Sequence, residues 1–307
     1  MPDIGIVIVT YNSGAEIGRC LDAALRTGAE IVVVDNASTD DTRREVARRP
    51  VRLIANEQNR GFAAAVNQGF RALATPFVLL LNPDAVILTA IEPLKRYCSL
   101  PSVAGAGGKL VNARGPQIGF MVRRLPSPAA LIFEILLINR LWPGNPVNWH
   151  YRCLDLDLSV AQKVEQPAGA FLMIRREIWE LLGGLAEQFH PLWFEDVDFA
   201  RRAKDKKYCM YYTPEVVAEH TGGHSIPKIS LEFRQFYWYC SLLRYSARHF
   251  DAWTARTVCL AVMAGSIPRI LAGIVQNRSL KPVAVYGKVI RLAARFFLGK
   301  DDISSLG

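Results

Sequence analysis

The sequence lacks several patterns that identify common classes of protein. Its six cysteines are scattered with no CxxC spacing, so neither a redox pair nor a zinc ribbon is predicted. Neither GxGxxG nor GxxxxGK[ST] follows the first apolar run, which argues against a dinucleotide-binding dehydrogenase and a P-loop kinase. No basic and apolar leader with a small-residue cleavage site opens the chain. We therefore expect reduced thiols and a cytoplasmic location.

Acidic residues are scarce in the last quarter of the chain. Residues 228–307 contain 12 Lys+Arg against 4 Asp+Glu, which accounts for most of the formal charge of +9. The same segment includes the aromatic run 236–239 and the apolar run 258–267. Basic, aromatic and apolar side chains together are typical of a segment that lies on an anionic membrane surface. The apolar run stops at Pro268 after about ten residues, half of what a membrane span needs, so we expect surface association. An ordinary helical subdomain with solvated arginines and a true membrane span stay open.

Short apolar runs alternate with helical patterns through the N-terminal half. Residues 4–10, 31–35, 51–55 and 77–81 are nearly all apolar, and residues 16–26, 39–48 and 61–73 have helical periodicity. This alternation predicts an α/β fold with a mostly parallel sheet and helices on both faces. Each apolar run ends in polar residues, at Thr10, Asp35, Asn56 and Asn82. Ligands of open α/β sheets bind at the carboxyl ends of the strands, so we expect these polar ends to line one crevice.

A set of short motifs occurs in the order seen in the family 2 glycosyltransferases. They are Ile-Val-Thr-Tyr-Asn (8–12), Val-Asp-Asn-Ala-Ser-Thr-Asp (34–40), Asn-Arg-Gly-Phe (59–62) leading to Asn67, Leu-Asn-Pro-Asp (81–84), Gly-Ala (169–170), Glu-Asp-Val-Asp (195–198) and His-Thr-Gly-Gly (220–223). Over roughly residues 4–250 the chain resembles this family, and within it the rhamnosyltransferase-like branch. The resemblance implies the GT-A fold over residues 1–227, with a donor half at about 1–112 and an acceptor half at about 113–227. A basic, apolar helical region, 228–307, would follow.

Three carboxylates lie within four positions, at Glu195, Asp196 and Asp198. The family inverts the anomeric centre, which needs one base to deprotonate the acceptor hydroxyl. The resemblance places that role on Asp196, with Glu195 beside it as a like-charge neighbour that keeps its pKa from falling. It places Gly169, Ala170 and Asp198 on the acceptor side, where small residues let an acceptor approach. A helix-capping role for the acidic run stays open, above all for Asp198.

The metal motif of the family appears here as Asn82-Pro83-Asp84, with one carboxylate fewer. Asp84 must then supply most of the protein's negative charge to the ion. By resemblance His220 is the second ligand, in a His-x-x-Gly-x-Ser pattern, and His224 is a weaker substitute. Diphosphate oxygens and water would complete the shell, and both Mn²⁺ and Mg²⁺ suit such a site.

The resemblance also assigns the donor side. A helix N-terminus at Gly61, with Arg60 alongside, suits the charge of a diphosphate. The residues expected to hold the base, ribose and diphosphate of the donor are Thr10, Tyr11, Asn12, Asp35, Asn59, Arg60, Gly61, Asn67, Asn82 and Asp84.

These expectations describe a metal-dependent inverting glycosyltransferase at the inner face of the cell membrane. Its donor would be a dTDP- or UDP-sugar, with dTDP-rhamnose as the first candidate, and its acceptor a lipid-linked or polysaccharide hydroxyl. A nucleotide-sugar-binding protein or a nucleotidyltransferase would also explain Asp35 and Asp84, but it would not need Glu195 and Asp196. A nucleic-acid-binding protein would explain the positive charge but not the acidic crevice, so no nucleic acid partner is expected.

Overall fold

The computed structural model describes residues 2–222 and 231–300, which fold as two compact units. The α/β unit comprises residues 2–125, 152–191 and 195–222, and the helical unit comprises residues 126–151, 192–194 and 231–300. Residues 126–151, which the sequence assigned to the acceptor half, thus pack with the C-terminal helices. His224 and Ser225 lie outside the described residues.

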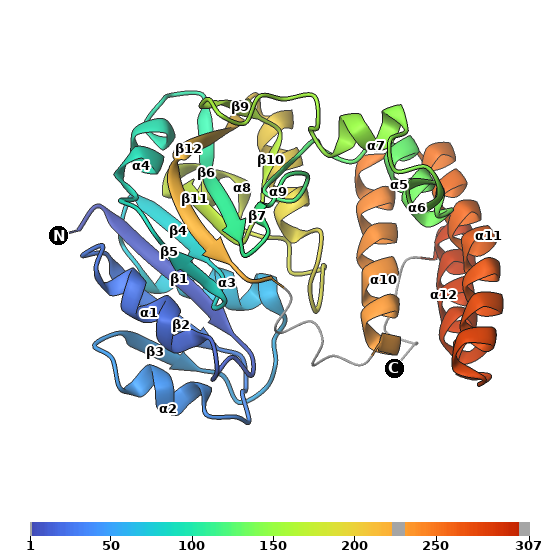
Figure 1. Ribbon diagram of the computed structural model, residues 1–307, viewed down its shortest axis with the longest axis horizontal. Helices are drawn as coiled ribbons and strands as arrows, with labels where there is room; N and C mark the ends of the chain where they lie inside the picture. The colour runs from blue at the N-terminus through green and yellow to red at the C-terminus, as the bar shows by residue number, and fades with distance from the viewer. Residues whose placement is uncertain (1, 223–230, 301–307) are drawn as a thin grey trace. The chain divides into compact units, whose positions relative to one another are not determined.

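A ten-stranded mixed sheet forms the centre of the α/β unit (Figure 1). Its main path is β3-β2-β1-β4-β11-β6-β12-β5, with β7 paired to β6 and β9 paired to β12, and β8 and β10 form a separate pair. The strands are β1 (Ile4–Thr10), β2 (Glu30–Asp35), β3 (Arg52–Ala55), β4 (Phe77–Leu81), β5 (Ala85–Ile87), β6 (Val103–Asn112), β7 (Gly115–Pro116), β8 (Val122–Arg123), β9 (Gln162–Val164), β10 (Gln166–Pro167), β11 (Phe171–Arg175) and β12 (Cys209–His220).

The strand order reverses between β1 and β4. The chain moves outward from β1 to β2 and β3, then returns to pair β4 with the other side of β1, and these four strands are parallel. Thr10 ends β1 and Asn82 follows β4 at the same edge of the sheet. A reversal of this kind opens a crevice at the carboxyl ends of the strands, which is the usual ligand site of such sheets.

Six helices belong to the α/β unit, and their apolar periodicity explains how they pack. They are α1 (Ile17–Leu25), α2 (Thr42–Ala47), α3 (Phe62–Ala72), α4 (Glu92–Cys98), α8 (Arg176–Leu182) and α9 (Glu195–Asp205). In α1, Ile17 and Leu21 are buried one turn apart, as are Val66 and Phe70 in α3, which marks the face turned to the core. All seven residues of β1 are buried, as expected where helices cover both faces of a parallel sheet. The four predicted strands and three predicted helices are confirmed, with boundaries that differ by three residues or fewer.

The helical unit brings together segments that lie far apart in the sequence. Its helices are α5 (Pro128–Ile135), α6 (Ile138–Leu141), α7 (Pro146–Tyr151), α10 (Leu231–His249), α11 (Ala252–Asn277) and α12 (Lys281–Phe297). Figure 1 shows the green helices α5 to α7 beside the orange-to-red helices α10 to α12. Arg269 of α11 donates a hydrogen bond to the carbonyl of Glu134 in α5 over 3.3 Å and another to the carbonyl of Gly265 over 2.8 Å. This arginine therefore ties α11 to α5.

Helix α11 does not end at Pro268, contrary to the expectation that the apolar run stops there. It continues through Pro268 to Asn277, because one lost backbone donor is tolerated when the rest of a long helix is packed. Among the described helices, α11 is the one long and apolar enough to cross a membrane: within Ala252–Gln276, an 18-residue window has a mean hydropathy of 2.0, and 33% of that window is buried. Length and composition alone carry this finding, and core helices of soluble proteins share both.

Candidate active site

Asp196 sits in the first turn of α9 and accepts hydrogen bonds at both carboxylate oxygens. Its Oδ2 atom accepts from the amide of Gly169 over 3.2 Å and from Nε2 of Gln166 over 3.3 Å. Its Oδ1 atom accepts from the amide of Val197 over 2.8 Å. Burial raises the pKa of Asp196, while these hydrogen bonds and the charge of Arg123 act in the lowering direction, and the net direction is upward. A carboxylate with a raised pKa accepts protons more readily, which suits a general base.

Glu195 is buried, whereas its neighbour Asp196 is partly exposed. Its Oε2 atom is enclosed and has no hydrogen-bond partner among the residues the structure describes. Burial, and after it the charges of Asp196 and Asp198, raise the pKa of Glu195 well above its ordinary value. The protonated form of Glu195 is therefore favoured. The expected coupling between the two carboxyls thus acts mainly on Glu195, and burial is the cause that raises the pKa of Asp196.

Asp84 and His220 meet because β5 and β12 pair. His220 lies directly opposite Ala85 in this antiparallel pair, so Asp84, the residue before β5, is its neighbour. The His220 Nε2 and Asp84 Oδ1 atoms are 3.6 Å apart, and the two side chains are 5% and 9% exposed. The amide of Thr221 donates to the carbonyl of Asp84 over 3.3 Å and closes the turn. The sequence predicted both residues, and the structure brings them together although 136 positions separate them.

The pair fits a divalent cation. Ligand distances of roughly 2.0–2.2 Å place two ligands of one ion about 3–4 Å apart, and the observed separation of 3.6 Å falls in that interval. A nitrogen and a carboxylate oxygen suit Mn²⁺ well. No group of three or more His, Cys, Asp or Glu side chains that could hold a metal occurs among the described residues. An ion at Asp84 and His220 would therefore need further ligands from substrate or water.

The dipeptide Gly169-Ala170 links the acidic pair to the metal-motif turn. The carbonyl of Ala170 accepts a hydrogen bond from the amide of Asn82 over 2.9 Å, and the amide of Gly169 donates to Asp196. A Cβ atom on Gly169 would lie 2.9 Å from Oδ2 of Asp196, which explains why glycine is needed there. The predicted base and the Asn82–Asp84 turn are therefore held in one frame.

Among the predicted donor residues, Thr10 and Asp35 form a buried network at the ends of β1 and β2. The Asp35 carboxylate accepts from Thr10 Oγ1 over 3.0 Å, from the amide of Ser38 over 3.1 Å and from Nε of Arg43 over 2.6 Å. Asp35 and Thr10 are both fully buried. Their side chains thus fasten the loops that follow the two strands, and the contact between Asp35 and a donor base stays a prediction.

Tyr11 and Asn12 follow Thr10 at the end of β1. Asn12 has a positive φ of 52°, a conformation that asparagine adopts more readily than most residues. Its amide donates to Oγ of Ser38 over 2.8 Å and its Oδ1 atom accepts from the amide of Thr39 over 2.8 Å. These bonds hold Tyr11 and Asn12 beside the loop after β2, at the carboxyl ends of the parallel strands.

Asn36 organises the segment that holds Asn59, Arg60 and Gly61. Its Nδ2 atom donates to Oδ1 of Asn59 over 2.9 Å and to the carbonyl of Gly61 over 3.1 Å. Its Oδ1 atom accepts from the amide of Arg60 over 3.1 Å. Sequence reasoning did not single out Asn36, although its position directly after Asp35 at a strand end was an available signal.

Asn67 and Asp198 make hydrogen bonds to other residues of the α/β unit. Nδ2 of Asn67 donates to the carbonyl of Leu185 and to Oε1 of Glu187, both over 2.9 Å. Asp198 is fully buried and its Oδ2 atom accepts from Nε of Arg202 over 2.7 Å. Both side chains have partners within the protein, and the expected donor contact of Asn67 and acceptor contact of Asp198 stay predictions.

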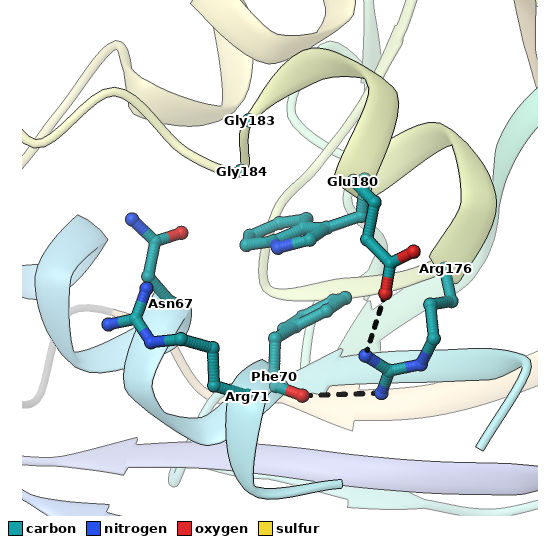
Figure 2. A pocket seen from close by; sticks show the side chains of 8 residues that line it. Asn67, Phe70, Arg71, Arg176, Glu180, Gly183 and Gly184 are labelled. Atoms are coloured by element: carbon teal, nitrogen blue, oxygen red, sulfur yellow. Dashed lines mark hydrogen bonds and ion pairs between the residues drawn. The ribbon is translucent and has the colours of Figure 1, made fainter. Parts of the chain in front are cut away.

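A pocket of about 220 Å³ lies between α3 and α8, and its lining side chains are drawn in Figure 2. Asn67, Phe70 and Arg71 line it from α3, and Arg176, Glu180, Gly183 and Gly184 line it from α8 and the residues that follow. Arg176 donates to the carbonyl of Phe70 over 3.2 Å and lies 3.6 Å from a Glu180 oxygen. Neither Asp84, Asp196 nor His220 lines this pocket, so it is not the candidate active site.

Residues 5–181 match the family model described as glycosyl transferase family 2. The low-salt glycan biosynthesis hexosyltransferase Agl10 of Haloferax volcanii is 26% identical over 209 residues, which are 66% of this chain. The chain spans 62% of the length of Agl10. The O-antigen chain rhamnosyltransferase WbaN of Salmonella anatum is 23% identical over 246 residues, covering 73% of this chain and 68% of WbaN.

Among solved structures, the mannosyltransferase PcManGT from Pyrobaculum calidifontis, in complex with GDP-Man and Mn²⁺, has a TM-score of 0.54 to this chain. The two are 18% identical, and the match covers 99% of this chain and 87% of that one. At this identity the likeness concerns the fold, and it confirms the expected mostly parallel α/β sheet followed by helices.

Proposed function

Because the chain belongs to glycosyl transferase family 2, we propose that it is a metal-assisted inverting glycosyltransferase. It transfers one sugar from a nucleotide-sugar donor to a hydroxyl group of a lipid-linked or polysaccharide acceptor. The observation that carries the proposal is the frame made by Gly169 and Ala170, which holds the Asp196 carboxylate and the Asn82–Asp84 turn together.

Asp196 acts as the general base in this reaction. Its carboxylate accepts the proton of the acceptor hydroxyl while the hydroxyl oxygen forms a bond to the anomeric carbon. The bond from that carbon to the nucleoside diphosphate breaks, and its electron pair stays on the departing phosphate oxygen. One such in-line displacement inverts the anomeric centre. Gln166 and Gly169 orient the carboxylate by donating to its Oδ2 atom, which fixes the direction of proton transfer.

Asp84 and His220 would hold the divalent metal. When bound, Mn²⁺ or Mg²⁺ neutralises charge that develops on the departing diphosphate. Asp84 is the one carboxylate of the Asn82-Pro83-Asp84 turn, so its removal should weaken metal binding more than removal of Asn82.

The donor proposed first is dTDP-rhamnose, among dTDP- and UDP-sugars. The name of WbaN as a rhamnosyltransferase supports this choice, whereas PcManGT was solved with GDP-Man. The polar residues that follow β1 and β2, and the segment around Arg60 and Gly61, would surround the nucleotide. Sugar identity depends on a few pocket contacts and is decided by measurement.

The test is turnover of a panel of dTDP-, UDP- and GDP-sugars with Mn²⁺ or Mg²⁺. The wild type is compared with Asp196→Asn and with Asp205→Asn, which changes an exposed aspartate at the far end of the same helix. We expect Asp196→Asn to lose at least roughly 10²-fold in kcat with donor binding retained, and Asp205→Asn to match the wild type. Unchanged turnover in Asp196→Asn would remove the base assignment. Nucleotide-sugar binding with no turnover of any donor, even with acceptor lipids added, would favour the non-catalytic binding protein.

The helical unit is proposed to bind an anionic membrane surface at the cytoplasmic face. Along α11 the large apolar residues Trp253, Leu260, Ile267, Leu271 and Val275 are all more than half exposed. Their spacing of seven or four residues puts them on one face, about 33 Å long from first to last. The two charged residues of α11, Arg256 and Arg269, are half-buried, and each donates to a backbone carbonyl of the unit.

The positive charge near this face favours binding to a bilayer that contains anionic lipids. Residues 252–300 contain eight basic residues and no acidic one, and Lys281, Lys288 and Arg291 of α12 are exposed. An uncharged apolar stripe together with nearby cations is the chemistry of an interfacial helix.

Vesicle sedimentation tests the membrane proposal. The wild type is expected to bind vesicles of phosphatidylglycerol and phosphatidylcholine more tightly than vesicles of phosphatidylcholine alone. The double variant Leu260→Glu/Leu271→Glu should lose this binding, while Leu181→Glu, an exposed leucine of the α/β unit, should keep it. Equal binding by the double variant and the wild type would exclude the α11 face.

A further inference from the structure

The side chain of Gln117 contacts His220 at two points. Its Nε2 atom donates to the carbonyl of His220 over 2.7 Å, and its Oε1 atom lies 3.1 Å from Nδ1 of the same histidine. Gln117 is itself anchored, because its amide donates to the carbonyl of Leu110 over 2.9 Å and its carbonyl accepts from the amide of Phe120 over 3.0 Å. The amide group of Gln117 is therefore a rigid two-point clamp on His220.

The His220 carbonyl determines which way this amide points. With the amide reversed, Oε1 would face the carbonyl oxygen at 2.7 Å, and neither oxygen carries a hydrogen. The observed orientation thus leaves Oε1, an acceptor only, against Nδ1 of His220. The hydrogen of that bond must belong to Nδ1. A histidine binds a metal as the neutral imidazole, which has one N–H group; in that form of His220 the hydrogen is on Nδ1 and Nε2 carries the lone pair.

That lone pair belongs to the nitrogen nearest Asp84. Nε2 and Oδ1 of Asp84 are 3.6 Å apart, which is too long for a direct hydrogen bond. Two electron-pair donors enclosed at this distance suit a cation between them. The ring of Phe120 stacks on the imidazole with centroids 5.3 Å apart and planes 11° apart, which limits rotation of the ring. Gln117 and Phe120 come from one turn, so a single loop sets both tautomer and ring plane.

We propose that Gln117 is a positioning residue of the metal site, which holds His220 as the Nδ1–H tautomer and aims its Nε2 lone pair at the ion shared with Asp84. This inference rests on the proposed function, which requires a metal at Asp84 and His220. It goes beyond that function by assigning Gln117 as the hydrogen-bond partner that orients His220. Such partners of ligating histidines fix the tautomer and ring orientation and raise the basicity of the ligand. The need is acute here, because the Asn82-Pro83-Asp84 turn has one carboxylate and His220 must supply a larger share of the affinity.

Two measurements without turnover test the role of Gln117. The first is the long-range ¹H–¹⁵N spectrum of the imidazoles in the metal-free full-length protein, with His220 assigned from a His220→Asn variant. We expect Nδ1 of His220 to be protonated and Nε2 to be unprotonated at neutral pH. A protonated Nε2, alone or together with Nδ1, would mean an ion pair or the other tautomer and would overturn the proposal.

The second measurement is Mn²⁺ affinity in the presence of UDP, followed by electron paramagnetic resonance. Gln117→Leu should bind Mn²⁺ roughly 10–100-fold more weakly than the wild type. Gln162→Leu is the matched control, because Gln162 also donates its Nε2 to a backbone carbonyl, that of Asp157, at an exposed site. Equal affinity of Gln117→Leu and the wild type would overturn the proposal, as would a wild type that binds no Mn²⁺.

If Gln117→Leu fails to fold, the imidazole spectrum of the wild type still decides. A wild type that meets both expectations but transfers no sugar would remove the proposed function and leave the role of Gln117 intact.

Discussion

The backbone amide of Gly169 donates a hydrogen bond to the Oδ2 atom of Asp196 over 3.2 Å. This contact requires glycine, because a Cβ atom at position 169 would lie 2.9 Å from Oδ2 and 3.1 Å from Cβ of Asp196. The backbone amide of Gly169 therefore fixes the position of the proposed base. Its position should be sensitive to a single added methyl group.

We expect Gly169→Ala to lower kcat while leaving donor binding close to that of the wild type. The methyl group must displace the Asp196 carboxylate, and a misplacement of about 1 Å at a reacting group can cost roughly 10²-fold in rate. Steady-state kinetics and titration with the nucleoside diphosphate measure the two effects separately. Gly144→Ala is the control, since a Cβ there meets nothing within 4 Å. Wild-type kcat in Gly169→Ala would show that the carboxylate position is not critical.

Glu195→Gln should make the protein relatively more stable as the pH rises. Burial raises the pKa of Glu195 in the folded state well above its ordinary value of 4.5. Above that ordinary value the unfolded chain is ionised at Glu195 while the folded chain keeps the proton, so unfolding releases a proton and the free energy of unfolding falls with pH. Below it both states are protonated and the effect vanishes. Glutamine has no proton to release.

The measurement is the free energy of unfolding of both proteins in urea from pH 4 to pH 8. The difference, variant minus wild type, should grow from about pH 4.5 upward by as much as about 1.4 kcal/mol per pH unit until the folded-state pKa is reached. A constant offset between the two proteins reflects packing and is not part of the prediction. A difference independent of pH would mean that Glu195 is ionised in the folded protein.

Elements with strong local signals were predictable from the sequence, and long-range pairing was not. The runs that form β1, β2 and β4 are apolar on both faces. This pattern can be recognised in the local sequence alone, without knowing which strands pair. Asp84 and His220 were assigned to one metal site by resemblance alone. Their proximity arises from the pairing of β5 with β12, which joins segments separated by more than a hundred residues, and periodicity carries no register information over that distance.

The direction of polar side chains was equally hidden. Asp35 and Asp198 stand at positions where the motif suggests ligand contact, yet both are fully buried against Arg43 and Arg202. A carboxylate that contacts a ligand and one that pairs with an arginine of the protein are the same residue type in the sequence. Gln117 was missed for the converse reason, because a lone glutamine in a turn has no recognisable spacing and acquires its role only from the His220 backbone that it contacts.

Arg123→Gln should move the acid limb of the pH profile of kcat/KM to higher pH. Arg123 lies directly opposite Gln166 in the β8–β10 pair, and its charge acts to lower the pKa of Asp196. Without that charge the pKa of Asp196 rises further, so the base is protonated, and activity lost, at a higher pH than in the wild type.

Profiles of kcat/KM from pH 4 to pH 9 test this expectation. Arg124→Gln is the adjacent control, because the Arg124 guanidinium binds both oxygens of Asp155 over 2.6 and 2.7 Å and its charge is not among the causes that act on Asp196. An acid limb that stays in place in Arg123→Gln, or one that moves equally in both variants, would contradict a specific action of Arg123 on the base.

Asp198→Ala should destabilise the fold without removing catalysis from the molecules that remain folded. Asp198 is fully buried, and its loss leaves the Arg202 guanidinium, which is 15% exposed, without its carboxylate. Breaking a buried ion pair by removing one partner costs roughly 3–5 kcal/mol. Arg202 also donates to the carbonyls of Leu182 and Gly184 over 2.6 and 2.8 Å, so the packing of α8 against α9 should loosen.

Urea unfolding measures the loss in the free energy of unfolding. Asp205→Ala, which removes the half-exposed partner of Arg201, is the control and should cost less than about 1 kcal/mol. Wild-type stability combined with a raised KM for the acceptor would restore Asp198 to the acceptor site and remove it from the packing of α8 against α9.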